Sequence, residues 1–331
     1  MADGMDDAQR EDHPSIRIGV ALREPIAWHD FVQIVQTAEE TGYEACFVPE
    51  IAGREAFSTL AALAPVTERV LLGTGIVPMH ARRAMTAAMA AATVQELSGG
   101  RLILGLGTGP PGAGTLDRLR SYVEAVRAAL AGRTFAPPDA PDQPTQLTLV
   151  PVAPPPIWIS ALGERGFALA GQIADGVLLN WCTPDRVARA REIVSETAAR
   201  VGRDPTAITI ALYVRANLVD EEPVAIDALR GATGQYASMP HYRRQMEAIG
   251  LGERAAEAAR ATAAGDLSGI PDDLVRTLCL VGDRSAALAR LEAFREAGAD
   301  LPIVYPVPGR EPVSSIMGTI LAAAPSTNLT A

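Results

Sequence analysis

Residues 69–109 read RVLLGTGIVPMHARRAMTAAMAAATVQELSGGRLILGLGTG. The apolar run over 70–77 gives way at Pro78 to an Ala- and Met-rich segment that closes at Ser98-Gly99-Gly100, which predicts a strand followed by a helix. A second apolar strand is predicted over 102–106. Neither strand alternates between apolar and polar residues, so both are expected to be covered on both faces, as parallel strands are.

Both predicted strands break into small residues where they end. The first carries Gly75 ahead of Pro78, and the second runs into Gly107-Thr108-Gly109. In parallel α/β proteins, ligands bind at the carboxyl ends of the strands. We therefore expect the binding site of this protein at these two strand ends.

Strand and helix signals keep alternating outside this stretch. A helix over 28–41 carries Phe31, Ile34, Val35 and Ala38 at the spacing of a buried helical face. Further strands are predicted over 16–22, 43–48, 157–160, 176–180, 208–219 and 301–306. This alternation predicts an α/β fold, a single (β/α)8 TIM barrel with a helical insertion before strand eight. The weaker alternative is a pair of doubly wound domains.

Several segments depart from the rhythm of the barrel. We expect residues 1–14 to be a disordered acidic tail and the barrel to run over 15–324. The proline-rich residues 132–155 are interpreted as an excursion on the barrel rim. The Ala-rich, helical residues 221–283 are interpreted as the insertion, which provides a cover for the barrel mouth, and residues 325–331 as a C-terminal tail.

The charge and the apolar pattern exclude several partners. A net charge of −10 and an isoelectric point near 5.0 argue against a nucleic-acid or anionic-membrane surface. No apolar run approaches the roughly 18 residues of a membrane span, and the polar N-terminus is unlike a signal peptide, so a cytoplasmic location is predicted. Cys46, Cys182 and Cys279 are too few and too scattered for a disulfide framework and are expected to be reduced core residues.

The basic residues limit the chemistry. All 29 are arginine, and the absence of lysine removes Schiff-base, pyridoxal-phosphate and lysine-base mechanisms. The four histidines have no metal-ligand spacing and no HExxH motif occurs, so no metal site is predicted. A nucleophile elbow of the G-x-S-x-G type is also absent from the sequence.

Four ordered segments carry a resemblance to a known family: GTGIVP (73–78), ATVQELSGGRLILGLGTG (92–109), PPIWISALGERGFALAGQIADGVLLNW (155–181) and LVGDRSAALARLEAFREAGADLPIVYPV (280–307). They resemble the bacterial luciferase-like monooxygenase superfamily, and within it the branch of oxidoreductases that use the deazaflavin coenzyme F420. The resemblance covers nearly everything from Ile16 to Ala323. It implies hydride transfer between coenzyme F420 and a small organic substrate.

Two other functions remain open within this resemblance. One is an FMN-dependent two-component monooxygenase, for which a separate reductase supplies the reduced flavin. The other is a member that has lost catalysis and serves as a flavin-binding or assembly protein. Relatives are often dimers packed through barrel helices, and the small-residue segment over 84–93 would allow a homodimer of this kind.

The resemblance also implies where the ring of the cofactor would lie. In relatives the third strand ends in a bulge, often with a cis peptide that does not precede proline, and the bulge presses against the ring. By position, this bond is Gly75-Ile76, followed by Val77. Gly107 and Thr108 are expected to approach the cofactor as well, because glycine lets the backbone come close.

The phosphate of the cofactor is expected at Ser160-Ala161-Leu162-Gly163. This stretch ends the fifth strand and begins a helix, and a helix N-terminus offers unpaired N–H groups and a positive dipole end to an anion. Family members use this loop for the same purpose. Trp181, after the sixth strand, is expected to form a wall for the ring or the substrate, with core packing as the alternative.

Glu50 and His80 are the expected catalytic residues. Glu50 follows the second strand in VPE, where F420-using relatives often carry an acid, and its alternative role is to cap a helix or pair with Arg54. His80 is expected at the mouth, and an ordinary imidazole pKa suits proton transfer. Glu24 is a third candidate proton donor.

The chain departs from one subgroup of the branch at two positions. Ile51 stands where a histidine commonly follows the acid, and Pro110 stands where sugar-phosphate dehydrogenases carry a glutamate. The lysines with which those enzymes grip a phosphate are absent too. These departures argue against the histidine-plus-glutamate alcohol oxidation of that subgroup.

Overall fold

The computed structural model describes residues 17–23, 25–109, 112–138, 140–218 and 221–325. The predicted tail over 1–14, the last residues of the tail over 325–331, Glu24 and Pro110 therefore lie outside the described residues. Within these ranges, no helix has both the length and the apolar character needed to cross a membrane.

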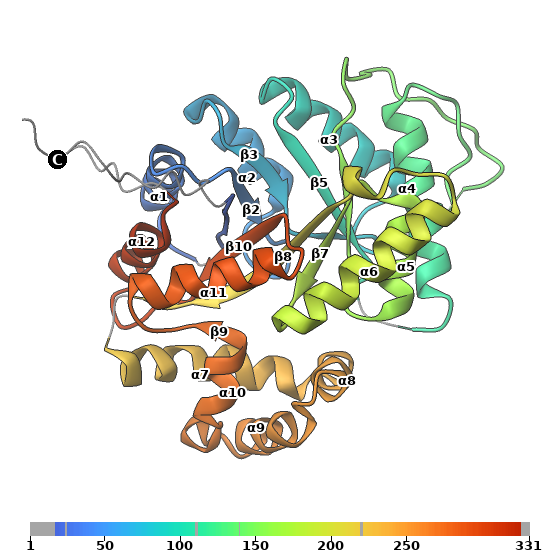
Figure 1. The fold of residues 1–331 in the computed structure, drawn as a ribbon. Coiled ribbons are helices and arrows are strands. Elements are labelled where there is room, and N and C mark those ends of the chain that lie inside the picture. Colours follow the sequence, from blue (N-terminus) through green and yellow to red (C-terminus); the bar gives the residue numbers. More distant parts are fainter. Residues whose placement is uncertain (1–16, 24, 110–111, 139, 219–220, 326–331) are drawn as a thin grey trace, which may run out of the picture.

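Eight parallel strands close into a barrel, as the alternation of the sequence predicts (Figure 1). The ring is complete because the last strand pairs with the first and with its predecessor in the barrel. In the order of the ring, the strands are β1 (Gly19–Ala21), β2 (Ala45–Val48), β3 (Leu71–Thr74), β5 (Leu102–Gly107), β6 (Ile157–Ser160), β7 (Gly176–Asn180), β8 (Thr209–Ala216) and β10 (Leu301–Pro306).

Helices surround the strands and bury one face each against them (Figure 1). On the first helix that face consists of Phe31, Ile34, Val35 and Ala38, the residues that the spacing predicts. The outer helices are α1 (Trp28–Glu40), α2 (Ala56–Leu63), α3 (Ala84–Leu97), α4 (Thr115–Leu130), α5 (Glu164–Ile173), α6 (Pro184–Arg200), α11 (Arg284–Glu296) and α12 (Pro312–Ala323), with short 3-10 turns η1 (Ala64–Val66) and η2 (Pro205–Ala207).

The predicted strand over 70–77 is interrupted. β3 ends at Thr74, and a separate short strand, β4 (Val77–Pro78), pairs with the end of β5. Between them the Gly75–Ile76 peptide bond is cis, at the position that the family resemblance indicates. The chain therefore leaves the regular ladder at the barrel mouth, where a ligand site is expected.

Large side chains fill the inside of the barrel. The rings of Phe47 and Trp158 lie 5.6 Å apart, centre to centre. A Cβ on Gly73 would overlap the Phe47 ring, and a Cβ on Gly176 would lie 2.6 Å from Trp158. Glycine at these two strand positions thus makes room for the two rings, and it explains why neither strand shows a continuous bulky run.

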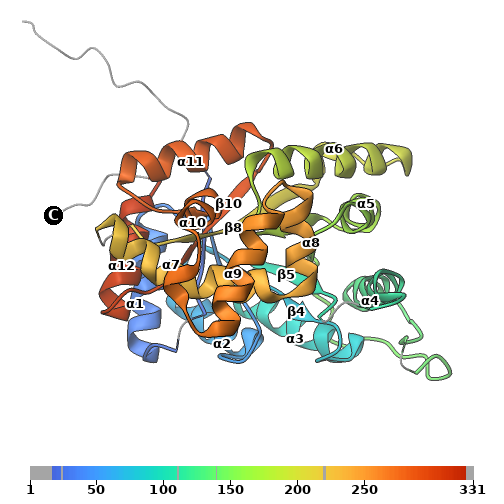
Figure 2. The same cartoon turned by 90° about the horizontal axis from the view of Figure 1, so that it is seen from below.

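The insertion lies across one end of the barrel (Figure 2). It comprises α7 (Glu222–Ser238), α8 (Pro240–Ala248), α9 (Gly252–Ala264), η3 (Leu267–Gly269), α10 (Asp272–Leu278) and the two-residue strand β9 (Cys279–Leu280). It has its own apolar cluster, which includes Ile226, Leu229 and Leu274. The sequence did not predict β9, which pairs with the end of β8 and joins the insertion to the barrel.

The tight contact between α5 and α6 (Figure 1) gives a test of the packing. A Cβ on Gly171 would lie 2.6 Å from the carbonyl oxygen of Val194, which is backbone and cannot easily move. We expect Gly171→Ala to lower the free energy of unfolding by about 1–3 kcal/mol through overpacking, despite the higher helix propensity of alanine. Thermal and urea unfolding measure the change.

The matched control is Gly231→Ala in α7, where nothing lies within 4 Å of the added methyl group. Here only the helix propensity changes, so we expect a gain of up to about 1 kcal/mol. Similar effects at the two positions would contradict the close approach of α5 and α6.

Glu39, in the last turn of α1, fixes the entry to β3. Its Oε1 accepts hydrogen bonds from the backbone N–H groups of Val70 at 2.7 Å, Arg69 at 2.6 Å and Glu68 at 3.0 Å. Burial opposes the charge of Glu39, but these three donors outweigh it and lower the pKa of the carboxyl below its ordinary value of 4.5. The carboxylate therefore contributes stability that is present above the unfolded-state pKa and is lost as the pH falls through the folded-state pKa.

We expect Glu39→Gln to cost about 1 kcal/mol of unfolding free energy at pH 7. The difference from the wild type should shrink as the pH falls below about 4.5, since the wild-type carboxyl becomes protonated too. Glu40→Gln is the control, because this exposed neighbour has no hydrogen bond or ion pair among the described residues. Urea unfolding across pH 3–8 measures the free energy of each protein. A difference between the wild type and Glu39→Gln that does not change with pH would contradict the role of the charge.

Candidate active site

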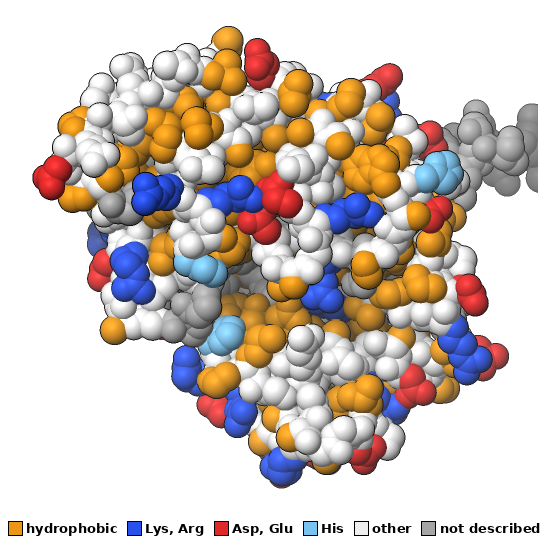
Figure 3. Space-filling view, turned by 180° about the vertical axis from the view of Figure 1, so that it is seen from behind, with side chains coloured by type: hydrophobic (Ala, Val, Ile, Leu, Met, Phe, Trp, Pro, Cys, Tyr) orange, Lys and Arg blue, Asp and Glu red, His pale blue; other side chains and the backbone are white. Residues whose placement is uncertain are grey.

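A cavity of about 810 Å³ opens at the carboxyl ends of the barrel strands, between the barrel and the insertion. Figure 3 shows the face of the molecule that is hollowed between these two parts, with apolar side chains inside the hollow. The lining comes from the ends of β2, β3, β5, β6, β7, β8 and β10, from the N-termini of α4 and α5, and from α7 and α8. The cavity therefore lies at the carboxyl ends of the strands, where the sequence predicts a binding site.

The floor of the cavity includes the interrupted third strand. Gly75 and Ile76 line it, as does Tyr213 of β8. The Tyr213 hydroxyl donates a hydrogen bond of 2.9 Å to the carbonyl oxygen of Gly75. Burial raises the pKa of Tyr213 well above its ordinary value, so this phenol stays a donor. The hydrogen bond links the break in the third strand to the opposite wall of the barrel.

The loop at the end of β6 forms one side of the cavity. Ser160, Ala161, Leu162 and Gly163 all line it. Gly163 is the N-cap of α5, and no side chain caps the helix there, so the first N–H groups of α5 lack the partner that an N-cap usually supplies. These donors and the helix dipole favour an anion at this end of the cavity.

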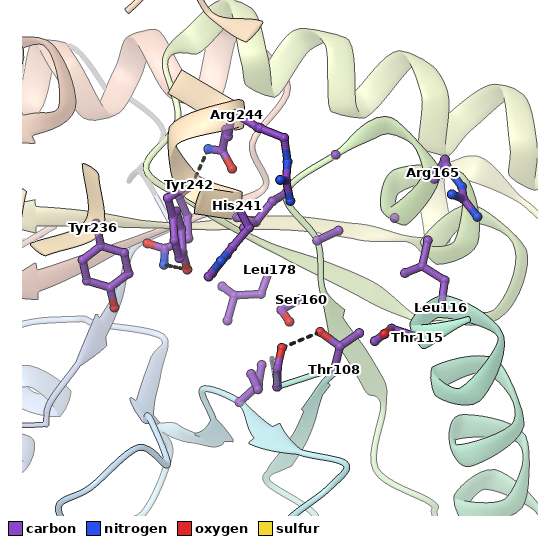
Figure 4. A pocket seen from close by; sticks show the side chains of 18 of the residues that line it. Thr108, Thr115, Leu116, Ser160, Arg165, Leu178, Tyr236, His241, Tyr242 and Arg244 are labelled. Atoms are coloured by element: carbon purple, nitrogen blue, oxygen red, sulfur yellow. Dashed lines mark hydrogen bonds between the residues drawn. The ribbon is translucent and has the colours of Figure 1, made fainter. Parts of the chain in front are cut away.

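A buried arginine supports the same loop. Nη2 of Arg186 donates a hydrogen bond of 2.8 Å to the carbonyl oxygen of Leu162, and its guanidinium lies 4.9 Å from the ring centre of Phe167. Arg186, Arg165 and Arg244 are all in the cavity lining. In Figure 4, Arg244 lies near His241 and Arg165 lies near Leu116, with Ser160 and Thr108 below both arginines in this view. The cavity lining thus contains three arginines along with the uncapped end of α5, and the acid in the first turn of that helix, Glu164, is paired with Arg189.

Gly107 and Thr108 stand at the end of β5. Thr108 lines the cavity, whereas Gly107 lies just beneath the lining. A Cβ on Gly107 would overlap the side chain of Ile76 and lie 2.7 Å from the Ser160 hydroxyl. Glycine here lets three predicted site elements, the ends of β3, β5 and β6, come together.

Glu50 lines the cavity, with 14% of its side chain exposed. Its Oε2 accepts hydrogen bonds of 3.0 Å from Nη2 of Arg82 and from the backbone N–H of Ala56, at the start of α2. Arg82 also pairs with Glu55, the N-cap of the same helix. Glu50 therefore contacts Arg82, and the predicted alternative of a pair with Arg54 is wrong. The other alternative, a contact with the start of a helix, is present at Ala56.

His80 is exposed and lies in the turn after β4, outside the cavity lining. Its ring faces Gly109, where an added Cβ would overlap it. Gly109 does line the cavity, so His80 stands behind the edge of the site. Its predicted role in proton transfer stays a prediction.

Trp181 and Val77 do not line the cavity. Only 1% of Trp181 is exposed, and its ring packs 5.0 Å from the ring of Tyr236 within the insertion cluster. The expectation that Trp181 forms a wall is therefore wrong for the cavity as it stands, and the alternative of core packing holds. Val77 is fully buried behind the cavity floor.

The sequence reasoning missed a polar group at the ends of β7 and β8. Arg215 and Asn180 line the cavity there, and Tyr236 and Tyr242 reach them from the insertion. Gln245 of α8 donates hydrogen bonds of 2.7 Å to the carbonyl oxygens of Asn180 and Trp181, which fastens α8 over the mouth. Asn180 stands at the end of the predicted strand over 176–180, which was an available signal, whereas Arg215 lies inside the predicted strand over 208–219.

The three cysteines take no part in the cavity lining. Cys46, Cys182 and Cys279 are buried and unpaired, as predicted. Burial raises the pKa of each thiol to about 12, so none is a thiolate near neutral pH.

Comparison with known proteins places this geometry in a family. The sequence model of the family described as luciferase-like monooxygenase matches residues 13–301. A Mycobacterium tuberculosis protein provisionally named a coenzyme F420-dependent oxidoreductase is 28% identical over 311 residues, which is 82% of this chain and 89% of the relative. The 5,10-methylenetetrahydromethanopterin reductase of Archaeoglobus fulgidus is 26% identical over 306 residues, with 86% and 91% covered.

Solved structures agree on the fold. The structure of coenzyme F420-dependent tetrahydromethanopterin reductase from Methanopyrus kandleri matches with a TM-score of 0.80 at 21% identity, over 94% of this chain and 98% of that one. The cis bond after β3 and the part of the cavity lining at Thr108 and 160–166 lie within the segments through which the sequence resembles the family. Because the family model matches most of its length, the chain belongs to the luciferase-like monooxygenase family.

Proposed function

We propose that the protein is an oxidoreductase that binds coenzyme F420 in the cavity and transfers a hydride between its deazaflavin ring and a small organic substrate. The observation that carries the proposal is the uncapped N-terminus of α5, which opens on a cavity of about 810 Å³ whose lining includes Arg165 and Arg186. A pocket of this size is in the range that holds a cofactor together with a small substrate. The names of the relatives favour F420 over FMN.

The residues present fit such a cofactor. The N–H groups at the start of α5, with Arg165 and Arg186 nearby, suit its phosphate. The apolar surface at Ile76 and the close approach at Gly107 suit a flat ring. Bound there, the deazaflavin supplies a two-electron hydride carrier.

The chain's own residues would hold and shield the reactants. Tyr213 supports the backbone beneath the ring through its hydrogen bond to Gly75, and α8 covers the mouth and excludes water. Glu50 is the proposed proton-exchanging residue, because its carboxylate lines the cavity. His80, at the edge, is the second candidate.

Further features belong to the same proposal. The partner in the reaction is a small molecule, and a separate reductase would be needed only if FMN replaced F420. A homodimer through α3 is supported by the exposure of Met89 and Leu97 on that helix, 48% and 54%. A cytoplasmic location stays a prediction.

The direct test is a fluorescence titration of the apoprotein with F420 and with FMN, each in both redox states. We expect a dissociation constant for F420 of about 1 μM or lower, and binding of FMN weaker by at least about tenfold, or 1.4 kcal/mol. A preference for reduced FMN would favour the two-component monooxygenase. Binding of neither cofactor would contradict both enzymes, and binding without turnover would favour the non-catalytic alternative.

Gly163 allows the charge at the phosphate end to be changed by itself. Its backbone is extended, with φ −121°, and nothing lies within 4 Å of an added Cβ. Aspartate is a preferred N-cap, so Gly163→Asp should leave the stability unchanged or raise it by up to about 1 kcal/mol. The same carboxylate repels a bound phosphate, and we expect the affinity for F420 to fall by at least about tenfold.

Gly163→Ala is the matched control, because a methyl group carries no charge and leaves the N–H groups at the start of α5 open. It should keep the affinity for F420 within about threefold. Equal losses in the two variants would mean that the side chain, and not the charge, disturbs binding, which would contradict a phosphate at the N-terminus of α5.

A further inference from the structure

Arg215 is a buried cation that faces the cavity. It lies at the end of β8 with 4% of its surface exposed, and it belongs to the cavity lining. Its guanidinium carbon lies between four aromatic rings, at 4.5 Å from the ring centre of Tyr305, 4.7 Å from Trp181, 5.0 Å from Tyr236 and 5.8 Å from Tyr213. This cage fixes the position of the charge.

The hydrogen-bond partners of Arg215 are neutral. Nη1 donates to Oδ1 of Asn180, and Nη2 donates to the Tyr236 hydroxyl at 3.3 Å. A guanidinium has five N–H donors, so these two bonds leave further donors for a ligand. Tyr236 and Tyr242 come from the insertion, and Tyr242 accepts a hydrogen bond of 2.8 Å from Asn180. Arg215 is thus held by Asn180 from the barrel and by Tyr236 from the insertion.

No carboxylate in the described part of the chain forms an ion pair with Arg215. Three acids line the cavity, namely Glu50, Asp117 and Glu164. Glu50 pairs with Arg82 and Glu164 pairs with Arg189, and the described ion pairs join none of the three to Arg215. Arg82 and Arg230 have little exposed side chain, and each contacts two carboxylates. Arg186 is also buried in the cavity lining, but it donates to the Leu162 carbonyl and lies beside the start of α5, where the cofactor phosphate is proposed. A buried charge without a partner is costly, and the faces of aromatic rings compensate only part of that cost.

We propose that Arg215 binds the carboxylate of the substrate, so that the substrate class of this oxidoreductase is an organic acid. The planar fork of arginine matches a carboxylate through two parallel hydrogen bonds. The site rests on the proposed function, because it assigns the cofactor phosphate to the start of α5 and leaves the Arg215 end of the cavity to the substrate. Tyr213, Tyr236 and Tyr305 surround Arg215 and line the cavity, and they provide the apolar walls for the rest of such an acid.

The test uses benzoate as the probe and benzamide as its neutral counterpart, both titrated into the wild-type apoprotein at pH 7 by calorimetry. We expect benzoate to bind at least about tenfold more tightly than benzamide. Arg215→Met should lose this preference, and Arg215→Lys should keep only part of it, because an ammonium lacks the planar fork. Equal binding of the two probes by the wild type would overturn the proposal without any variant.

The control is Arg290→Met. Arg290 is half-buried beside Phe294, at 5.1 Å from its ring centre, and lies outside the cavity lining. This variant should bind benzoate as the wild type does. A second readout is the unfolding temperature: benzoate should raise it for the wild type and for Arg290→Met, but not for Arg215→Met. A purely structural role of Arg215 would leave the benzoate response of the folded variant unchanged, which would overturn the proposal.

A titration with F420 separates the two sources of negative charge. If the anion belongs to the substrate, Arg215→Met should bind F420 within about threefold of the wild type. Loss of F420 affinity in this variant, with no preference for benzoate in the wild type, would assign Arg215 to the cofactor and overturn the proposal. If the wild type binds benzoate through Arg215 but not F420, the proposed function fails while the acid site stands.

Discussion

The contact between Phe47 and Trp158 fills the inside of the barrel and so restricts where a ligand can bind. The two rings meet inside the barrel, and glycines at 73 and 176 leave the space that they fill. An interior that is packed in this way is a core and has no room for a ligand. A site on the barrel axis therefore has to lie at an end of the barrel, and the cavity is found at the carboxyl ends of the strands. Along β8, the inward-facing side chains change from apolar to charged toward the mouth. Ala211 packs in the barrel core, Tyr213 lies between the core and the cavity, and Arg215 lines the cavity.

The insertion turns this open mouth into a cavity. Gln245 ties α8 to the backbone at Asn180 and Trp181, and β9 pairs with the last residues of β8. Tyr236 covers Arg215 from the same side. The burial of Arg215 thus depends on contacts between segments far apart in the sequence, and the dielectric around the cavity floor depends on the insertion staying closed.

The fold followed from local patterns, and the site followed only in part. The helical spacing of Phe31, Ile34 and Val35 and the apolar strand over 102–106 are local, and the structure confirms both. The loop at Ser160 could be placed because a strand end and a helix start meet there. Arg215 could not, because within the strand ALYVRA an arginine is indistinguishable from a residue at a solvated strand end. Its burial is made by Tyr236 and Tyr305, which are distant in sequence.

Arginine suits both charged ends of this cavity for the same physical reason. Arg186 supports the loop at Leu162, and Arg215 stands across the cavity in its aromatic cage. A lysine in either buried position would readily lose its proton, whereas a guanidinium stays charged and also stacks on rings. A chain without lysine can therefore keep fixed positive charge inside an apolar site. These two cations, one beside the start of α5 and one at the end of β8, line the same cavity as the apolar side chain of Ile76, and they offer two anchor points to bound ligands.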